Sequence, residues 1–314
     1  PDQAALLVAR IAAISLFAHA YAWHLNFRLG QARPIDLLHF AHQHQLVGVK
    51  IHVEDGEARS LLHDPASHPE FAACARDLRL AVRIGTSSTQ AADLAAAIGV
   101  AHATGASSVR FYPRHSGPLS QVMATTIADL KRLPELNPDG GLDYLLEQHE
   151  DLKGTELVQI LHATANPRLS LLFDFANMIN AGETPQTALD AMAPYITDVH
   201  IKDAQILPDR GGYAHRACRS GEGDIDFAVL LTRLLLLGND APQVRAFALE
   251  EENEMFAPAY RFAGEGPDPV IPARDASTTH LTPGESLPDR LAREQHEATA
   301  QIRYVRAPLR DVSD

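Results

Sequence analysis

Four side chains of the kinds that bind divalent cations lie at or near the carboxyl ends of four successive apolar segments of the chain. These residues are Glu147, Asp174, His200 and Glu250, in segments 142–148, 169–175, 197–202 and 244–250. If the segments are neighbouring parallel strands, their carboxyl ends meet at one face of the fold. Burying three carboxylates together without a cation would be costly, so the pattern predicts a metal site. Mostly oxygen ligands with one nitrogen favour Mn²⁺, with Mg²⁺, Co²⁺ and Zn²⁺ as alternatives.

The alternation of side chains along a strand predicts which residues point inward. In segment 244–250, Ala246, Ala248 and Glu250 share one face, and the larger Phe247 and Leu249 share the other. Small residues suit a crowded barrel interior, whereas large apolar ones suit packing against helices. This assignment favours Glu250 as the fourth ligand over its acidic neighbours in the run 251–254.

Two further polar residues share a face with the predicted ligands. His149 lies two residues beyond Glu147, and Lys202 lies two residues beyond His200. We expect His149 to contact a substrate hydroxyl, with a structural role as the alternative. Lys202 would either stabilise a developing oxyanion or pair with a neighbouring aspartate, at position 198 or 203.

Such a site suits reactions that remove a proton from carbon next to a carbonyl. A chelated divalent ion would stabilise the resulting enediolate. Glu147 and Glu250, on the fifth and eighth predicted strands, could flank the substrate and carry protons to and from it. Isomerisation or epimerisation of a small keto-sugar or hydroxy-ketone would use this chemistry. Dehydration of a keto-sugar or decarboxylation of a 3-oxo sugar acid by a lyase would use the same intermediate, so the product stays open.

Alternating strands and helices must position these residues. Eight short apolar segments are predicted as strands: 11–17, 48–53, 78–84, 107–112, 142–148, 169–175, 197–202 and 244–250. Amphipathic segments predict helices at 34–45, 90–104, 119–132, 155–165, 184–193 and 227–237. Eight such repeats predict an α/β fold, a (β/α)8 TIM barrel with a long insertion after strand eight. A doubly wound sheet would usually carry a glycine-rich loop after its first strand, and residues 15–28 contain no glycine.

Two regions depart from the regular repeat. Residues 206–224 are expected to form a long loop, and residues 256–288 form the extended insertion, which would be a lid or an interface. A terminal helix is predicted at 289–306, within one domain spanning 1–314.

The chain resembles the xylose isomerase-like TIM-barrel superfamily, which includes sugar isomerases, epimerases, sugar-acid dehydratases and, in AP endonuclease family 2, endonuclease IV. The motifs that carry the resemblance are Leu146-Glu147-Gln148-His149, Phe173-Asp174-Phe175-Ala176-Asn177, Val199-His200-Ile201-Lys202-Asp203, Gly221-Glu222-Gly223-Asp224-Ile225-Asp226 and Leu249-Glu250. The match spans about residues 11–250 in element order, and the motifs all lie in its second half.

The resemblance implies a single divalent metal ion held by Glu147, Asp174, His200 and Glu250, with the two glutamates also moving protons. It implies a small-molecule carbohydrate substrate. An arginine before the Gly-x-Gly motif would contact substrate oxygens, and both Arg216 and Arg219 are candidates. The resemblance also implies a homodimer or homotetramer.

Other polar residues are assigned from their positions alone. His19 and His24 follow the first predicted strand and are expected to be loop residues. Arg110 on the fourth strand is expected either to form a salt bridge or to bind an anionic group. His52 ends the second strand and could extend the cluster towards a site with several metals.

Composition excludes several other classes. The chain has 40 Asp and Glu against 27 Lys and Arg, a formal net charge of −13, which argues against a nucleic-acid partner and an endonuclease. The apolar stretch 4–23 is interrupted by polar residues, so no membrane span is expected. Two separated cysteines indicate no disulfide framework, and a cytoplasmic enzyme is expected. A non-catalytic binding barrel is the remaining alternative.

Overall fold

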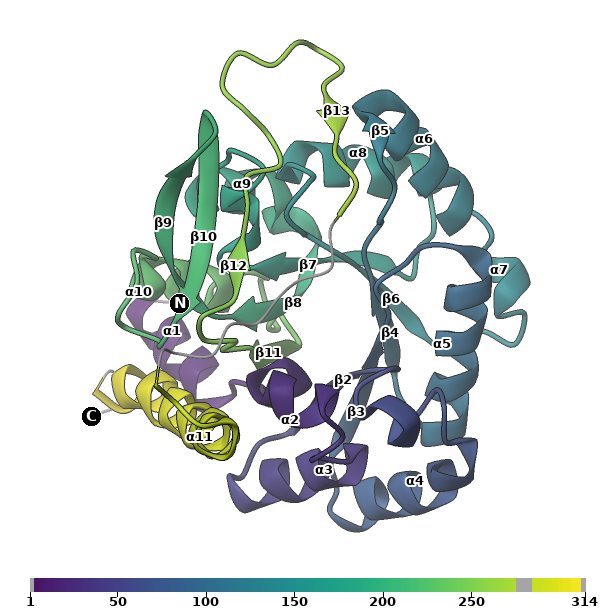
Figure 1. Cartoon of the computed structure of the whole chain (residues 1–314), viewed down its shortest axis with the longest axis vertical. Coiled ribbons are helices and arrows are strands. Elements are labelled where there is room, and N and C mark those ends of the chain that lie inside the picture. Colours follow the sequence, from purple (N-terminus) through teal and green to yellow (C-terminus); the bar gives the residue numbers. More distant parts are fainter. Residues whose placement is uncertain (1–2, 275–283, 312–314) are drawn as a thin grey trace.

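The centre of the molecule is a closed barrel of eight parallel strands, in the order β1-β11-β8-β7-β6-β4-β3-β2 (Figure 1). The structure is a computed structural model, and it describes residues 3–274 and 284–311. The barrel strands are β1 (Leu16–His19), β2 (Gly48–His52), β3 (Ala81–Gly85), β4 (Ser108–Phe111), β6 (Asp143–Glu147), β7 (Leu169–Asp174), β8 (Ile196–Ile201) and β11 (Ala246–Leu249). The closed barrel confirms the predicted TIM-barrel fold and excludes a doubly wound sheet.

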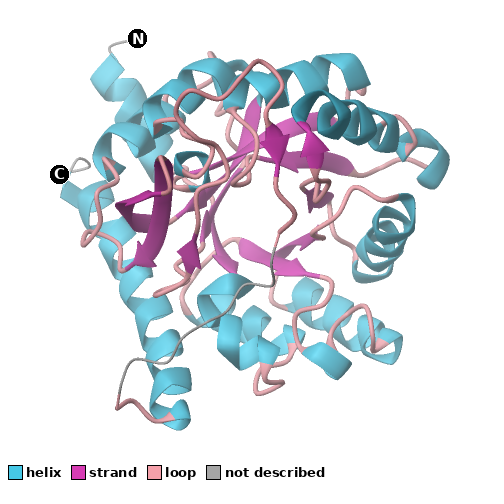
Figure 2. Ribbon diagram, turned by 45° about the horizontal axis from the view of Figure 1, so that its top comes forward, coloured by secondary structure: helices cyan, strands magenta, loops and turns pink. Residues whose placement is uncertain are grey.

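Helices surround the barrel on its outer side (Figure 2). They are α1 (Gln3–Ala12), α2 (His24–Arg28), α3 (Pro34–Gln43), α4 (His68–Asp77), α5 (Ala91–Thr104), α6 (Leu119–Leu130), α7 (Leu133–Leu136), α8 (Gly154–Thr164), α9 (Pro185–Met192), α10 (Phe227–Leu235) and α11 (Leu287–Asp311). In α5 the buried residues Leu94, Ala97, Ile98 and Ala101 recur at helical spacing, so one stripe packs inward.

Side chains alternate between the barrel interior and the helix layer, as the sequence predicts. Phe247 and Leu249 belong to the main core that the helices cover. Ala246 and Ala248 instead form a separate buried cluster with Phe17. The small residues therefore leave space inside the barrel, where the polar ends of the strands meet.

The beginning of the chain differs from the prediction. Residues 11–17 were expected to form the first strand, but Ile11 lies in α1 and β1 begins at Leu16. Alanine and leucine dominate residues 3–12, and their helix propensity outweighs the short apolar run. Helix α4 lies between the second and third predicted strands, where no helix is predicted from the sequence.

The predicted long loop at 206–224 is wrong, because most of it is a β-hairpin. Strands β9 (Asp203–Asp209) and β10 (Gly212–Cys218) pair antiparallel along their whole length. Arg210 and Gly211 form the turn with positive φ angles of 49° and 86°. Two such residues match the twist of the flanking strands, which explains the tight connection.

The insertion after β11 crosses the mouth of the barrel to the opposite side (Figure 1). Its strand β12 (Phe256–Ala257) pairs with β10, and β13 (Val270–Ile271) pairs with β5 (Gly117–Pro118). Of the predicted insertion 256–288, residues 275–283 lie outside the described residues. The predicted terminal helix 289–306 lies within α11, and no described helix has the length and apolar character needed to cross a membrane.

A buried ion group fills the barrel interior below the strand ends. Asp198 on β8 is fully buried, and its Oδ1 lies 2.8 Å from Lys50 Nζ and 2.9 Å from Arg83 Nη1. Lys50 and Arg83 are register partners on β2 and β3, so one carboxylate compensates two cations across the barrel. This arrangement makes the aspartate essential to the charge balance of the interior.

We expect Asp198→Asn to lower the free energy of unfolding by about 3–5 kcal/mol, because two inward cations lose their carboxylate. Urea denaturation would measure the loss. Asp190 pairs with Arg233 in exposed positions, so Asp190→Asn should change stability by at most about 1 kcal/mol. Equal effects of the two substitutions would contradict this account of the interior.

Candidate active site

The four residues predicted as metal ligands converge at the carboxyl ends of neighbouring strands. Glu147, Asp174, His200 and Glu250 are buried, and each offers a ligand atom within 4.8 Å of the others. His200 Nδ1 lies 3.1 Å from Glu147 Oε1, 3.0 Å from Glu250 Oε2 and 3.9 Å from Asp174 Oδ2. The structure therefore brings the four together, while their binding of an ion stays a prediction.

Backbone contacts set the orientation of Asp174. Its Oδ1 accepts hydrogen bonds from the amides of Ala176 and Asn177, at 2.8 and 2.9 Å. These bonds form the turn into a short 3₁₀ helix, Asn177–Ile179. Because Oδ1 is committed to the turn, Oδ2 is the oxygen left to face the cluster.

The donor atoms of the cluster fit a divalent cation. Several of them are buried and make no hydrogen bond within the described residues: Glu147 Oε2, Asp174 Oδ2, Glu250 Oε2 and both His200 nitrogens. Buried polar atoms usually have partners, so such a concentration requires an explanation. Three carboxylates and one imidazole form a donor set that Mn²⁺, Mg²⁺, Co²⁺ or Zn²⁺ accepts.

The acids of the cluster have strongly perturbed pKa values. Burial raises the pKa of Glu147, but Arg110 and His200 outweigh it and lower the pKa to about 2. Burial, opposed by Lys202 and reinforced by the charge of Glu250, raises the pKa of Asp174 to about 7. Burial and the neighbouring carboxylates therefore oppose a negative charge on Asp174, and a divalent cation in the cluster would favour that charge.

Lys202 lies inside the cluster and does not pair with the aspartates considered from the sequence. Its Nζ lies 3.0 Å from Asp174 Oδ2 and 3.6 Å from Glu250 Oε2, and donates to Asn177 Oδ1 at 2.9 Å. Asp198 is taken by the interior ion group. The alternative of a pair with Asp198 or Asp203 is therefore wrong, and the contacts with Asp174 and Glu250 place Lys202 beside the proposed ligands.

Asp203 has a structural role that explains the Gly-x-Gly motif. Its Oδ2 accepts hydrogen bonds from the amides of Gly221 and Gly223, at 2.8 and 3.1 Å. A Cβ on Gly223 would stand 2.1 Å from Asp203 Oδ1, so only glycine permits this approach. The motif closes the segment after β10 around Asp203.

A pocket of about 360 Å³ leads to the cluster, and its lining includes Glu147, Lys202 and Glu250. Its walls combine aromatic, basic and acidic side chains. The His149 ring stacks on Tyr112 with centroids 3.7 Å apart, and both residues line the pocket, while contact of His149 with a substrate hydroxyl stays a prediction. These rings offer apolar faces next to hydrogen-bonding groups, a combination that suits a sugar.

The predicted arginines lie away from this pocket. Arg216 is exposed on β10, opposite Phe256. Arg219 Nη2 lies 2.9 Å from Glu297 Oε1 on α11. Neither residue is part of the pocket lining in the described structure.

Other arginines, among them Arg110 and Arg274, line the pocket instead. Arg110 is buried and forms a salt bridge with Glu147, which was one of its two expected roles, and it also lines the pocket. Arg274, from the insertion, lies between the rings of Tyr112 and Tyr260, at 5.5 and 4.9 Å from their centroids. No sequence signal marked Arg274, because a long insertion gives no register against the barrel.

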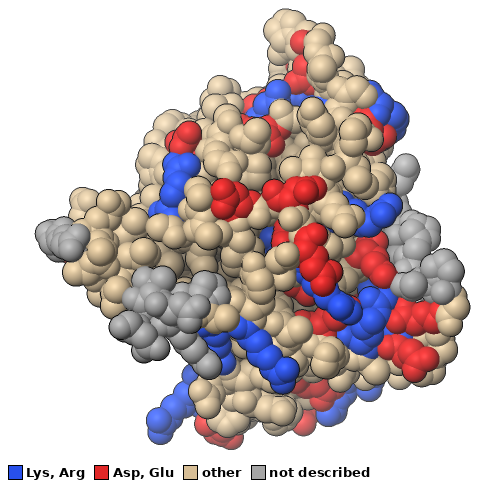
Figure 3. All heavy atoms as spheres, turned by 90° about the vertical axis from the view of Figure 1, so that its left-hand side faces the viewer, with Lys and Arg blue, Asp and Glu red and all other residues tan. Residues whose placement is uncertain are grey.

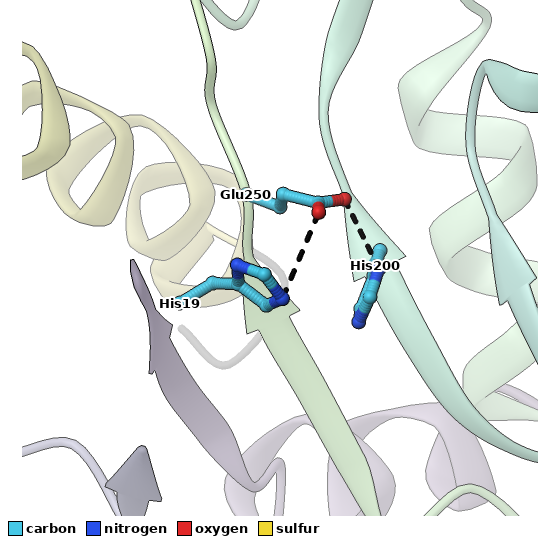
Figure 4. A group of neighbouring side chains, drawn as sticks. All are labelled: His19, His200 and Glu250. Carbon is cyan, nitrogen blue, oxygen red and sulfur yellow. Dashed lines mark ion pairs between the residues drawn. The ribbon is translucent and has the colours of Figure 1, made fainter. Parts of the chain in front are cut away.

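His19 is also placed differently from its prediction. It is not a loop residue but the last residue of β1, and it is buried beside Glu250 (Figure 4). The rule that strand ends carry functional residues would have identified it if the strand had been predicted at 16–19. His52 hydrogen-bonds with Ser87 at 3.0 Å and lies outside the ligand groups found among the described residues.

Comparison with known proteins identifies relatives over most of the chain. The profile of the family described as xylose isomerase-like TIM barrel matches residues 26–244. The uncharacterized protein YihM of Escherichia coli K12 is 47% identical over 312 residues, covering 99% of this chain and 96% of YihM. The 3-oxo-isoapionate decarboxylase of Pectobacterium atrosepticum is 23% identical over 223 residues, covering 69% of this chain and 79% of that protein.

Solved structures share the barrel at low sequence identity. IOLI protein, solved with a bound zinc atom, matches with a TM-score of 0.61 at 13% identity, covering 76% of this chain and 90% of its own. The 3-keto-D-glucoside 4-epimerase YcjR of Escherichia coli matches with a TM-score of 0.57 at 12% identity, covering 93% and 99%. At this identity, both structures support the fold alone.

The geometry predicts which residue of the acidic run 250–254 is the fourth ligand. Glu250 Oε2 faces His200, whereas Glu252 lies 3.2 Å from His24 Nδ1. We expect Glu250→Gln to weaken Mn²⁺ binding by on the order of 100-fold or more, and Glu252→Gln to weaken it far less. Calorimetric titration of the metal-free protein would measure both affinities. A larger loss in the Glu252 variant would assign the ligand to position 252 instead.

Proposed function

The chain belongs to the xylose isomerase-like TIM barrel family, and on this premise we propose that it is a divalent-metal-dependent isomerase or epimerase. The proposed substrate is a small keto-sugar or hydroxy-ketone. The observation that carries the proposal is the buried group of three carboxylates and one imidazole at the base of the pocket. The epimerase whose barrel is similar gives the reaction class its precedent.

Glu147, Asp174, His200 and Glu250 would hold the ion. When bound, a divalent cation supplies positive charge that stabilises the enediolate formed after a proton leaves carbon next to a carbonyl. Mn²⁺ is the ion we expect, because carboxylate oxygens dominate the donor set.

Glu147 and Glu250 are the proposed proton carriers. Glu147 ends β6 and Glu250 directly follows β11, which β7 and β8 separate from β6 in the barrel, and both residues line the pocket. Each therefore reaches a bound substrate from a different strand, as an exchange of protons between two faces requires. Lys202 lies between Asp174 and Glu250, where its ammonium would contact a developing oxyanion.

The pocket favours a substrate of monosaccharide size. About 360 Å³ is near the lower end for small-molecule sites. The insertion narrows the mouth, since Asn180 Nδ2 donates to the carbonyls of Ala257 and Pro258 at one side. At the other side, Asp268 accepts a hydrogen bond from the Ser120 amide at 2.7 Å. With both ends of its described part fastened, the insertion leaves room for a sugar ring or short chain rather than a polymer.

A lyase acting on a keto-sugar or 3-oxo sugar acid is the second candidate. Its support is the decarboxylase that matches 69% of the chain, together with the cations Arg110 and Lys202 at the pocket. A cation beside the substrate would orient a carboxylate, and a divalent ion held by the same four residues would supply the charge that stabilises the enediolate left by loss of CO₂.

An endonuclease is less well supported. The chain carries a net charge of −13, and acidic and basic groups are interspersed on the face that Figure 3 shows. A site with several metals would need further histidine ligands. Within the described residues, the candidate ligand groups include His19 from β1 and His200 from β8, whereas His52 hydrogen-bonds with Ser87 and is not among them. A nucleic-acid phosphate backbone would instead favour a continuous basic surface. A non-catalytic barrel would predict no turnover with any sugar.

We expect the purified protein to carry about one divalent ion per chain and to catalyse exchange of a carbon-bound proton. Elemental analysis would measure the ion, and NMR in D₂O with keto-sugars and sugar acids would follow deuterium incorporation. His200→Ala should lose the ion, and Glu147→Gln should slow exchange by about 10²–10⁴-fold. Exposed Glu135 supplies the control, Glu135→Gln, which should retain both properties.

The outcome separates the candidates. Deuterium in a product with the formula of the substrate supports the isomerase or epimerase, whereas release of CO₂ or water supports the lyase. Absence of bound metal in the native protein, even after reconstitution with each ion, would refute both and favour the binding barrel.

A further inference from the structure

His19 approaches the proposed metal site from β1. Its Nε2 lies 3.6 Å from Glu250 Oε1, and its ring centroid lies 4.6 Å from that of His200 (Figure 4). His19, His200 and Glu250 form a second group whose ligand atoms lie within 4.8 Å of one another. From these distances alone, His19 could either bind a second ion or donate a hydrogen bond from a protonated ring nitrogen to Glu250.

The position of the ring proton distinguishes these roles. The amide of Tyr21 donates a hydrogen bond to His19 Nδ1 at 3.1 Å, which caps the 3₁₀ helix Ala20–Trp23. An amide can only donate, so Nδ1 carries the lone pair, and the proton of the neutral ring is on Nε2. A metal-binding histidine has the opposite arrangement: its lone pair faces the ion and its other nitrogen donates outward. His19 therefore presents a proton to Glu250, not a lone pair.

We propose that His19 is a positioning residue whose Nε2–H holds Glu250 Oε1, so that Glu250 offers only Oε2 to the ion. This inference rests on the proposed function, because it assumes an ion at Glu250. Oε2 is the oxygen that lies 3.0 Å from His200 Nδ1 and 3.6 Å from Lys202 Nζ. The carboxylate's two oxygens thus have separate tasks, and the site holds one ion.

His19 acts through Glu250 and not on the substrate. It is absent from the lining of the 360 Å³ pocket, and instead borders a void of about 10 Å³ with Lys50 and Arg83 below. The 3.6 Å contact exceeds a hydrogen bond, and we expect it to shorten in the metal-loaded protein, since such contacts tighten when a site is complete.

Two variants of the full chain separate this role from the cap. In His19→Asn, the shorter side chain keeps an acceptor for the Tyr21 amide but does not reach Glu250. In His19→Gln, the amide nitrogen lies near the position of the histidine Nε2 and can donate to Oε1. Comparison of the two therefore isolates the contact with Glu250 from the local fold.

Cobalt(II) supplies a readout independent of activity. We expect one Co²⁺ per chain in the wild type and in both variants. In His19→Asn, Glu250 is free to offer both oxygens, so the visible absorption of the cobalt should change and affinity should fall by about 10–100-fold. His19→Gln should restore the wild-type spectrum, which a merely structural role for His19 would not predict.

The ring proton can be observed directly. Nitrogen NMR of metal-free wild-type protein should show His19 protonated at Nε2 and unprotonated at Nδ1, with the signal assigned by its loss in the variants. This measurement decides the tautomer even if His19→Asn does not fold.

Several results would overturn the inference. They are a proton on Nδ1, a second Co²⁺ in the wild type that is lost in His19→Asn, or identical cobalt spectra and affinities in wild type and His19→Asn. These outcomes leave the proposed function intact as long as the wild type binds an ion. If the wild type binds neither Co²⁺ nor any of the other divalent ions, the proposed function fails, and the inference about His19 fails with it.

Discussion

The arrangement of the whole active site follows from one constraint, the burial of Glu147, Asp174 and Glu250 around His200. Three carboxylates at these distances repel one another in a medium that screens poorly. Lys202 and Arg110 offset part of this charge, each placed against one of the acids. The remaining excess of negative charge is what a divalent cation would neutralise.

Such a group needs a rigid frame, and α11 supplies much of it from the far end of the chain. Gln301 Nε2 donates to the carbonyl of Ile201, between His200 and Lys202 on β8, at 2.9 Å. Arg290, which is almost fully buried, donates to the carbonyl of Asn253 after β11. The terminal helix therefore fixes the segments that follow two of the ligand strands, so the helix belongs to the architecture of the site as well as to the barrel wall.

The barrel and its four proposed ligands could be predicted from the sequence because both depend on local patterns. Apolar runs mark strands, alternation along a strand separates Glu250 from Leu249, and parallel strands end at one face. The hairpin at 203–218 could not be predicted in this way, since its turn at Arg210 and Gly211 lacks the usual asparagine or aspartate. The position of Arg274 at the pocket could not be predicted for another reason, since its partners, Glu150 and Asp151, lie more than a hundred residues away in the sequence.

The contrast between Arg219 and Arg274 shows how the insertion changes the site. The arginine that precedes the Gly-x-Gly motif is held by Glu297, so it does not reach the pocket. Arg274 enters from the other side of the mouth, already paired with Glu150 and Asp151 and held between two tyrosine rings. A guanidinium neutralised by two carboxylates has little charge left to attract an anion, but its planar face and N–H groups remain suited to hydroxyl groups. Arg274 would therefore suit the hydroxyl groups of the proposed keto-sugar better than a phosphate group.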